Sequence, residues 1–337
     1  MGSGWKALLS AVVFLATTTF PGSPALSQSG KGGVEDKFPE KAVRIVVPST
    51  PGGALDFLSR LIGPHLTKAW GQPVLAENRS GAGGIIGTDV VVNAPPDGHT
   101  LLVVAGGFTV NPFIYAKLPY DSVKDLAPVT LLVSSTHVLV VHPKVPVQSI
   151  RELIALARAK PGKLTYAISG IGTGGYLCSE LMKNTAGIDM LGVSYKGAGA
   201  ATTAALGGEV DMLFTQIAPV INHIKSGRLR AFATTSLQRS RELPDVPTLS
   251  ESGLPGFEVD AWNGMLAPAA TPAGIVLKVQ RDVSKVLHSA DVREKLAAAG
   301  FEPVGESPEK FAALIKTEMA KWSKLMKDIG VKPEAVK

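Results

Sequence analysis

The chain has 337 residues, of which 45% are hydrophobic, so it is long enough for about two domains with buried cores. Its formal net charge is +6, but the lysines and arginines are scattered rather than clustered, which argues against nucleic-acid binding. Cys178 is the only cysteine, which excludes an intrachain disulfide and a cysteine-based metal site.

Residues 1–27 have the features of a secretory signal peptide. Lys6 is the only charged side chain before a mostly apolar run at residues 7–16, and residues 25–27 fit a small-x-small cleavage site. The alternative is an uncleaved membrane anchor, but the apolar run is short for a membrane span. The sequence therefore predicts a cleaved leader and a periplasmic chain.

The first structural signal is a strand that runs through a glycine turn into a helix. Residues 44–47 form a β-branched run typical of a buried strand, and Gly52 and Gly53 allow a sharp turn. From Ala54 onward apolar residues recur at helical spacing. The unpaired N–H groups in the first turn of such a helix favour a small anion.

The next elements extend this pattern into an alternating series. Strands are expected at residues 73–77 and 101–105, with a helix at 85–93 between them. The β-α-β-α-β order predicts a parallel sheet with crossover helices. Ligands of such sheets bind beyond the carboxyl ends of the strands, where these turns cluster.

A long apolar strand at residues 129–141, with a polar break at 134–137, is expected to cross into a second lobe. The strands and helices expected in that lobe alternate, at residues 149–159, 164–169, 176–182, 191–195, 200–206, 210–214, 218–225 and 229–235. The strand at 229–235 is expected to turn back toward the first lobe, followed by an extended crossing at 243–247. Amphipathic helices at 276–287, 292–299 and 308–329 should then pack on lobe one.

A second glycine turn, residues 170–175, follows the strand at 164–169 and precedes a helix. Its glycines fit the spacing of a dinucleotide fingerprint. The acid expected about twenty residues later is Asp189, which precedes the next strand instead of ending it, so a dinucleotide site is disfavoured. Two such turns, more than a hundred residues apart, indicate two lobes that face one cleft.

The sequence offers no set of catalytic residues. It contains no P-loop and no nucleophile elbow, and its six histidines form no zinc-binding motif. We therefore predict no catalytic residue, no metal site and no cofactor. Asp56 suits the positive end of its helix, while Lys196 either meets an anion or is a solvated loop lysine. The sequence therefore favours a protein that binds a ligand without catalysing a reaction on it.

Several stretches together resemble the periplasmic solute-binding proteins of tripartite tricarboxylate transporters, the Bug family. They are residues 48–56, 78–84, 169–174, 195–197, 207–211, 243–248 and 262–264. The resemblance implies an α/β fold of the two-lobed periplasmic binding protein type (type II-like, a Venus flytrap) with two crossover segments. On this basis, lobe one comprises residues 38–132 plus 249–337, and lobe two comprises residues 133–248.

The resemblance also implies where the ligand binds. In the family, backbone amides, hydroxyls and ordered waters hold a ligand carboxylate between two loops, here residues 49–53 and 169–174. Tyr176 stands where the family often has a histidine, and it either faces the ligand or packs inside its own lobe. The predicted ligand-binding residues are Ser49, Thr50, Pro51, Gly52, Gly53, Asp56, Gly84, Ser134, Ser169, Gly170, Gly172, Thr173, Gly174, Tyr176, Lys196 and Asp211.

The function expected from these observations is the capture of a small organic carboxylate outside the cytoplasm. The protein is expected to act as a monomer and to deliver its ligand to membrane permease subunits. The alternative is a partner that presents its ligand to a membrane sensor kinase. An enzyme is disfavoured because the catalytic set is missing.

Overall fold

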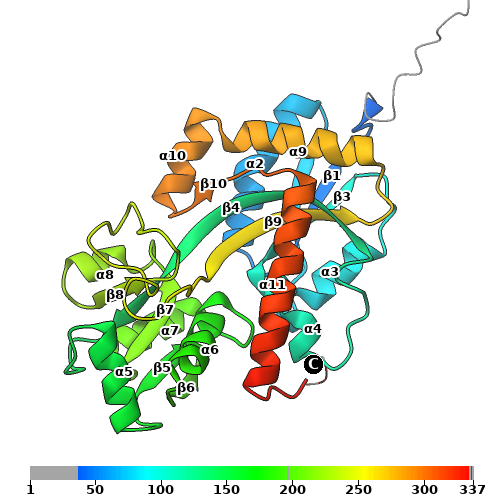
Figure 1. The fold of residues 1–337 in the computed structure, drawn as a ribbon. Coiled ribbons are helices and arrows are strands. Elements are labelled where there is room, and N and C mark those ends of the chain that lie inside the picture. The colour runs from blue at the N-terminus through cyan, green and yellow to red at the C-terminus, as the bar shows by residue number, and fades with distance from the viewer. Residues whose placement is uncertain (1–36, 196, 334, 336–337) are drawn as a thin grey trace, which may run out of the picture. The chain divides into compact units, whose positions relative to one another are not determined.

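The computed structural model describes residues 37–195, 197–333 and 335 (Figure 1). The predicted signal peptide, residues 1–27, lies outside the described residues. The strands are β1 (Val43–Val47), β2 (Val74–Asn78), β3 (Thr100–Ala105), β4 (Leu126–Val141), β5 (Thr165–Ile168), β6 (Leu191–Ser194), β7 (Met212–Gln216), β8 (Arg230–Thr234), β9 (Asp260–Pro268) and β10 (Glu302–Pro303).

The helices follow the strands in the alternation that the sequence predicts. They are α2 (Ala54–Trp70), α3 (Ile85–Val92), α4 (Asn111–Ile114), α5 (Ile150–Ala159), α6 (Gly174–Ala186), α7 (Ala198–Gly207), α8 (Ile221–Lys225), α9 (Ala273–Leu287), α10 (Ala290–Ala298) and α11 (Pro308–Asp328), with the 3-10 turns η1 (Ala82–Gly84) and η2 (Gly106–Thr109). Among the described residues, no helix has both the length and the apolar surface that crossing a membrane requires.

The strands form one mixed sheet in the order β2-β1-β3-β9-β4-β7-β5-β6. β1 pairs in parallel with β2 and β3, and β5 pairs in parallel with β6 and β7, so the two predicted strand–turn–helix units are confirmed. Each unit begins with a strand whose carboxyl end leads into a glycine turn. Both turns therefore lie at carboxyl ends of parallel strands, where ligands bind in sheets of this kind.

The long strand β4 belongs to both halves of this sheet. Residues 126–136 pair antiparallel with β9, and residues 137–141 pair antiparallel with β7. We call β1, β2, β3, β9 and the first part of β4 the first half-sheet, and the remaining strands with the rest of β4 the second half-sheet. The polar break at residues 134–137 therefore marks the passage from one half-sheet to the other, and Figure 1 shows β4 and β9 running side by side.

The expected return to the first lobe is confirmed in one detail and wrong in another. β8 pairs antiparallel with residues 138–141 of β4 inside the second half-sheet, so it runs back toward the first half-sheet as expected. Residues 243–247 form a turn, in which the Val246 N–H donates to the Leu243 carbonyl at 3.0 Å, rather than an extended crossing. The chain returns through β9, which the sequence analysis missed. β9 is specified by its long pairing with β4, a contact that local pattern does not reveal.

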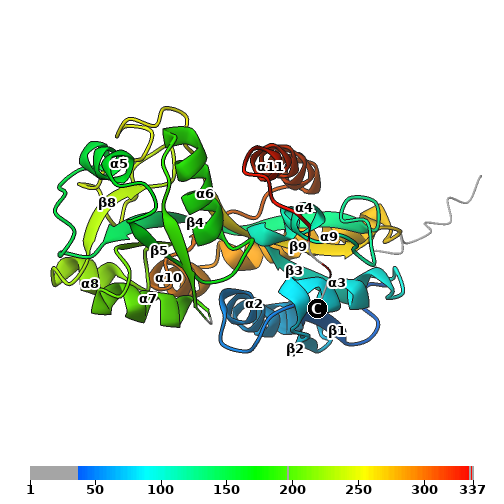
Figure 2. The same ribbon diagram turned by 90° about the horizontal axis from the view of Figure 1, so that it is seen from below.

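Side chains alternate across the first half-sheet, so each face has its own core. Ile45 and Val47 pack with Leu58 of α2 and with α9, while Val46 points the other way and packs in the cluster that contains Phe311 of α11. Figure 2 shows α2 and α11 on opposite sides of this half-sheet. The predicted packing of the carboxyl-terminal helices against lobe-one strands is confirmed for α9 and α11, which contact β4.

The second half-sheet is covered in the same way. Leu139 packs in one cluster with Leu153 of α5 and Met182 of α6, whereas Val138 packs in another cluster with Ala201 of α7. The small side chains of α7 allow this helix to lie close to the strands. Both half-sheets are therefore three-layered, as the alternating pattern predicts. The exact lobe boundaries, 38–132 plus 249–337 and 133–248, stay a prediction.

Candidate functional site

A cavity of about 450 Å³ lies where loops from both half-sheets meet. Each contributing loop follows the carboxyl end of a strand, which explains why segments so distant in sequence come together. The loop residues in its wall include Pro48, Ser49 and Gly53 after β1, Gly83 and Gly84 after β2, Gly106, Gly107 and Phe108 after β3, and Ser169, Gly172 and Thr173 after β5. We call this space the loop cavity.

The first turns of two helices meet at the loop cavity. α2 begins after Gly53 and α6 begins after Thr173, and neither helix has a side-chain cap on its first N–H groups. The Thr173 hydroxyl donates instead to the Gly170 carbonyl at 2.7 Å. These N–H groups carry partial positive charge and are free to bind an anion.

Three buried polar atoms of the cavity wall have no hydrogen-bond partner among the described residues. They are Ser49 Oγ, His137 Nδ1 and Trp262 Nε1. An unpaired buried polar atom costs about 1–3 kcal/mol, so native proteins rarely leave one without a partner. The Trp262 indole N–H can only donate a hydrogen bond, and the Ser49 hydroxyl can donate one. Both therefore suit the oxygens of a bound ligand.

His137 is a neutral member of the site. Its ring packs under the start of α6, where a Cβ on Gly174 would overlap the ring. Burial lowers the pKa of His137 to about 4, and the Val259 carbonyl offsets this only in part. His137 therefore carries no charge near neutral pH and contributes a polar ring rather than a cation.

The ionisable side chains of the wall, apart from His137, are acidic. Asp260 lies at the start of β9, and desolvation followed by the nearby Glu258 raises its pKa to about 6. Glu318 of α11 is buried and accepts a hydrogen bond from Trp322 Nε1 at 2.9 Å. The wall holds no lysine or arginine within the described part of the chain. An anion in the cavity would thus be held by neutral donors.

The structure brings seven of the sixteen predicted residues to the loop cavity: Ser49, Gly53, Gly84, Ser169, Gly172, Thr173 and Gly174. Five others lie in the same two loops or in the helix starts that follow them, but outside the cavity wall: Thr50, Pro51, Gly52, Gly170 and Tyr176. Lys196 lies outside the described residues. The remaining three, Asp56, Ser134 and Asp211, have other positions.

Asp56 holds the first glycine turn in place. Its buried carboxylate accepts the Gly52 N–H at 3.0 Å and Arg60 Nε at 2.9 Å, and these hydrogen bonds lower its pKa to about 2. Gly52 has a φ of 86°, a conformation that disfavours other residues. Asp56 thereby stabilises the turn at Gly52, and both of its carboxylate oxygens already accept hydrogen bonds from within the protein.

Tyr176 and Asp211 also make contacts within their own half. Tyr176 is half-buried against the core cluster of α5 and α6, and burial raises its pKa to about 12. Asp211 accepts hydrogen bonds from the Thr165 N–H at 2.8 Å and the Thr165 hydroxyl at 2.9 Å. It therefore ties β7 to β5.

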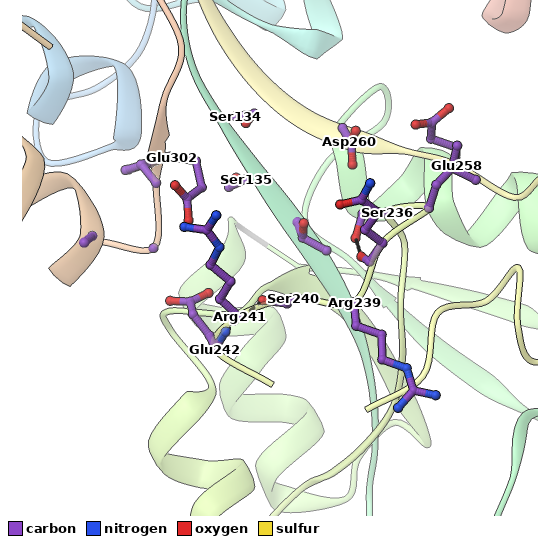
Figure 3. Close-up of a pocket in the computed structure, with 16 residues that line it drawn as sticks. Ser134, Ser135, Ser236, Arg239, Ser240, Arg241, Glu242, Glu258, Asp260 and Glu302 are labelled. Atoms are coloured by element: carbon purple, nitrogen blue, oxygen red, sulfur yellow. Dashed lines mark hydrogen bonds between the residues drawn. The ribbon is translucent and has the colours of Figure 1, made fainter. Parts of the chain in front are cut away.

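Ser134 lines a different cavity, of about 710 Å³, at the edge of β4 (Figure 3). This second cavity lies among β4, the loop at residues 236–242 and the segment at residues 297–302. Its charged side chains are mixed in sign: Arg239, Arg241, Glu242, Glu258, Asp260 and Glu302. Asp260 lines both cavities. Neither of the two glycine turns predicted to bind the ligand, residues 49–53 and 169–174, lines the second cavity among the described residues.

Sequence reasoning gave little weight to residues of the wall that come from β4, β9 and α11. They include His137, Trp262, Glu318 and Trp322. The polar break in the apolar strand β4 is a signal that could have identified His137. No local signal identifies Glu318 or Trp322, because α11 reaches the cavity only through long-range packing.

The described residues of the site form no arrangement suited to covalent chemistry. The described residues include no group of three or more histidine, cysteine, aspartate or glutamate side chains that could hold a metal ion. Cys178 is fully buried, and burial raises the pKa of its thiol. The geometry is that of a binding site.

Comparison with known proteins agrees with this geometry. The model of the tripartite tricarboxylate transporter family receptor matches residues 58–331. The chain is 35% identical to protein BugT of Bordetella pertussis over 299 residues, which is 88% of this chain and 92% of BugT.

Two solved structures have the same architecture. Rpa4515 of R. palustris, solved with adipate, has a TM-score of 0.78 and 33% identity, covering 88% of this chain and 99% of that one. MatC of Rhodopseudomonas palustris, solved with bound malate, has a TM-score of 0.74 and 34% identity, covering 86% and 100%. The chain thus belongs to the tripartite tricarboxylate transporter receptor (Bug) family, and it has the two-lobed fold of periplasmic solute-binding proteins, which are not enzymes.

Proposed function

We propose that this protein captures a small organic carboxylate outside the cytoplasm and delivers it to the permease of a tripartite tricarboxylate-type transporter. The observation that carries the proposal is the set of unpaired donors around the loop cavity. Ser49 Oγ and Trp262 Nε1 are buried without partners among the described residues, beside two uncapped helix starts. A carboxylate has the charge and the oxygens to satisfy both.

The relatives with known ligands support this class of ligand. Rpa4515 and MatC were solved with adipate and malate, which are both carboxylates. We further propose that the predicted lobes, residues 38–132 plus 249–337 and residues 133–248, close around the ligand.

The location and partners belong to the same proposal. A cleaved signal peptide at residues 1–27 would deliver the chain to the periplasm as a monomer. The alternative partner, a membrane sensor kinase, predicts a different phenotype. Deletion of the gene should abolish uptake of the ligand if the partner is a permease, and should abolish only ligand-dependent signalling if the partner is a sensor.

The binding proposal is tested by thermal unfolding of the purified chain with mono-, di- and tricarboxylates and aromatic acids. A ligand at a hundred times its Kd should stabilise the fold by about 2.7 kcal/mol and raise the Tm. Trp262→Phe keeps an aromatic ring but removes the N–H, so it should weaken the stabilisation. A panel in which no carboxylate raises the Tm would contradict the proposed function.

A further inference from the structure

The second cavity, like the loop cavity, is bounded by both halves of the chain. One wall is the loop at residues 236–242, which follows β8 of the second half-sheet. The opposite wall is the segment at residues 297–302, in which Phe301 packs in the core cluster of α2 and the first half-sheet. Figure 3 shows Glu242 on one wall and Glu302 on the other. The width of the second cavity therefore depends on the angle between the two halves.

The strand β4 separates the two cavities where it passes from one half-sheet to the other. Thr136 lines the second cavity and His137, the next residue, lines the loop cavity, because successive side chains of a strand point to opposite faces. Thr136 pairs with Asp260 of β9, and Asp260 lines both cavities. Figures 1 and 2 show α10, which borders the second cavity, and α6, which borders the loop cavity, on opposite sides of β4.

The two halves also touch one another at a point between the two cavities. A Cβ on Gly300 would lie 2.7 Å from the Cβ of Ala218, which is a very close approach. Gly300 lines the second cavity, whereas Ala218 precedes Pro219 of the loop-cavity wall. This contact and the passage of β4 and β9 are thus two places where the halves meet with one cavity on either side.

A hinge rotation about a line through these two places changes both cavities at once. The cores of the two halves are closely packed and move as rigid bodies, so a rotation that narrows the space on one side of the line widens the space on the other. We propose that the second cavity is the back of the hinge: it widens when the loop cavity closes around a ligand and narrows when the loop cavity opens. Its lining residues therefore set ligand affinity without touching the ligand.

This inference rests on the part of the proposed function in which the two halves close around a ligand. Only the closed form holds the ligand from both sides, so the apparent affinity falls with the fraction of molecules that can close. A bulky side chain in the second cavity would resist its narrowing. Such a wedge would raise the closed fraction and tighten binding from a distance.

Charged side chains of the second cavity are unsuited to this test because they act in both directions. Desolvation, followed by the charge of Glu302, raises the pKa of Glu242, so groups on opposite walls influence one another. Narrowing would increase this repulsion, but Arg241 of the same loop would attract Glu302. Arg239 is already paired with Glu251 at 2.9 Å. Uncharged wedges separate the hinge geometry from the electrostatic field at the ligand.

The test uses one wedge on each wall, Ala297→Trp and Gln238→Trp, at exposed positions that line the second cavity. Calorimetric titration of the mature chain with adipate, malate and benzoate should show binding at least roughly threefold tighter in each variant for any acid that binds the wild type. Ala298→Trp is the control, because Ala298 is exposed and lies outside the cavity wall, and it should leave the affinity unchanged. Unchanged or weaker binding in either wedge variant, once shown to be folded, would overturn the inference.

Small-angle scattering tests the same geometry without a ligand. Each ligand-free wedge variant should have a smaller radius of gyration than the ligand-free wild type, because fewer molecules have an open loop cavity. An unchanged radius in both folded variants would overturn the inference. If no carboxylate binds the wild type, the proposed function fails, but a smaller radius in the wedge variants and not in Ala298→Trp would still support the hinge.

Discussion

A Cβ on Gly107 would lie 2.9 Å from the carbonyl oxygen of Gly172, so these two glycine loops, one from each half-sheet, approach as closely as backbones allow. Gly107 follows β3 and Gly172 follows β5, and both residues line the loop cavity. The absence of a side chain at Gly107 is therefore a condition for the two halves to meet here.

Gly107→Ala should weaken ligand binding without unfolding the protein. The new methyl group would push the two loops apart by a few tenths of an ångström, while both cores remain packed. We expect an affinity loss of roughly threefold to tenfold, measured by titration with a carboxylate that binds the wild type. Gly207→Ala is the control, because nothing lies within 4 Å of a Cβ there. An unchanged affinity in Gly107→Ala would show that the contact plays no part in binding.

Gly53→Val tests the first loop directly. Gly53 has a φ of −81°, which other residues adopt, and a Cβ there would meet only Thr50 O at 3.7 Å and Ser49 Oγ at 3.9 Å. The variant should therefore fold, but its side chain would crowd the start of α2, where a carboxylate oxygen would approach. Binding should fall by roughly tenfold or more, with Gly207→Val as the control. A folded variant that keeps its affinity would remove this loop from the binding site.

His137 should make stability depend on pH. The pKa of His137 falls to about 4 in the folded protein, whereas histidine in the unfolded chain has a pKa of about 6.5. Below about pH 6.5 the unfolded chain therefore binds a proton that the folded chain does not bind. Stability is thus full above pH 6.5 and is lost as the pH falls, by about 2 kcal/mol at pH 5. Denaturant unfolding at pH 7 and pH 5 should show a smaller loss in His137→Leu than in the wild type.

The control for this comparison is His288→Gln, since His288 is exposed. It should keep the pH dependence of the wild type. If the wild type and His137→Leu lose the same free energy of unfolding between pH 7 and pH 5, the folded protein protonates His137 without cost. That result would conflict with the burial of the ring.

Local sequence patterns predicted the parts of the fold in which a strand, a turn and a helix follow one another directly along the chain. The units around Gly53 and Thr173 are of this kind, because apolar periodicity and glycine turns encode them within about twenty residues. β9 escaped prediction because its pairing partner lies more than a hundred residues earlier. Asp56 illustrates the limit for the site: its charge and position suit an anion-binding helix start, but only the structure reveals that Gly52 and Arg60 occupy its oxygens.

The wall of the cavity shows the same limit. Ser49 and Ser169 belong to the loops that sequence reasoning selected, whereas Trp262 and Glu318 arrive from β9 and α11. Which face of a strand or helix meets a cavity depends on tertiary packing that no short stretch encodes. The glycine turns and the family resemblance could therefore predict a binding protein, but not the acidic character of one part of its wall.

Asp260 should make anion binding stronger at mildly acidic pH. Its pKa of about 6 means that it loses its negative charge as the pH falls from 7.5 to 5, and a bound anion would raise that pKa further. The charged groups that influence Asp260 are Glu258, Glu318 and Lys321. Affinity for a carboxylate that stays ionised above pH 5 should therefore rise as the pH falls, when measured by titration across this range.

Asp260→Asn should flatten this profile, because the amide does not titrate. Tyr176→His should leave the profile as it is in the wild type, because Tyr176 packs against the core of the second half-sheet and lies outside the cavity wall. A histidine that faced the ligand would instead add affinity as it gains charge below about pH 6.5. If Tyr176→His steepens the profile, position 176 faces the ligand. If Asp260→Asn leaves the profile sloped, a group other than Asp260 titrates beside the anion.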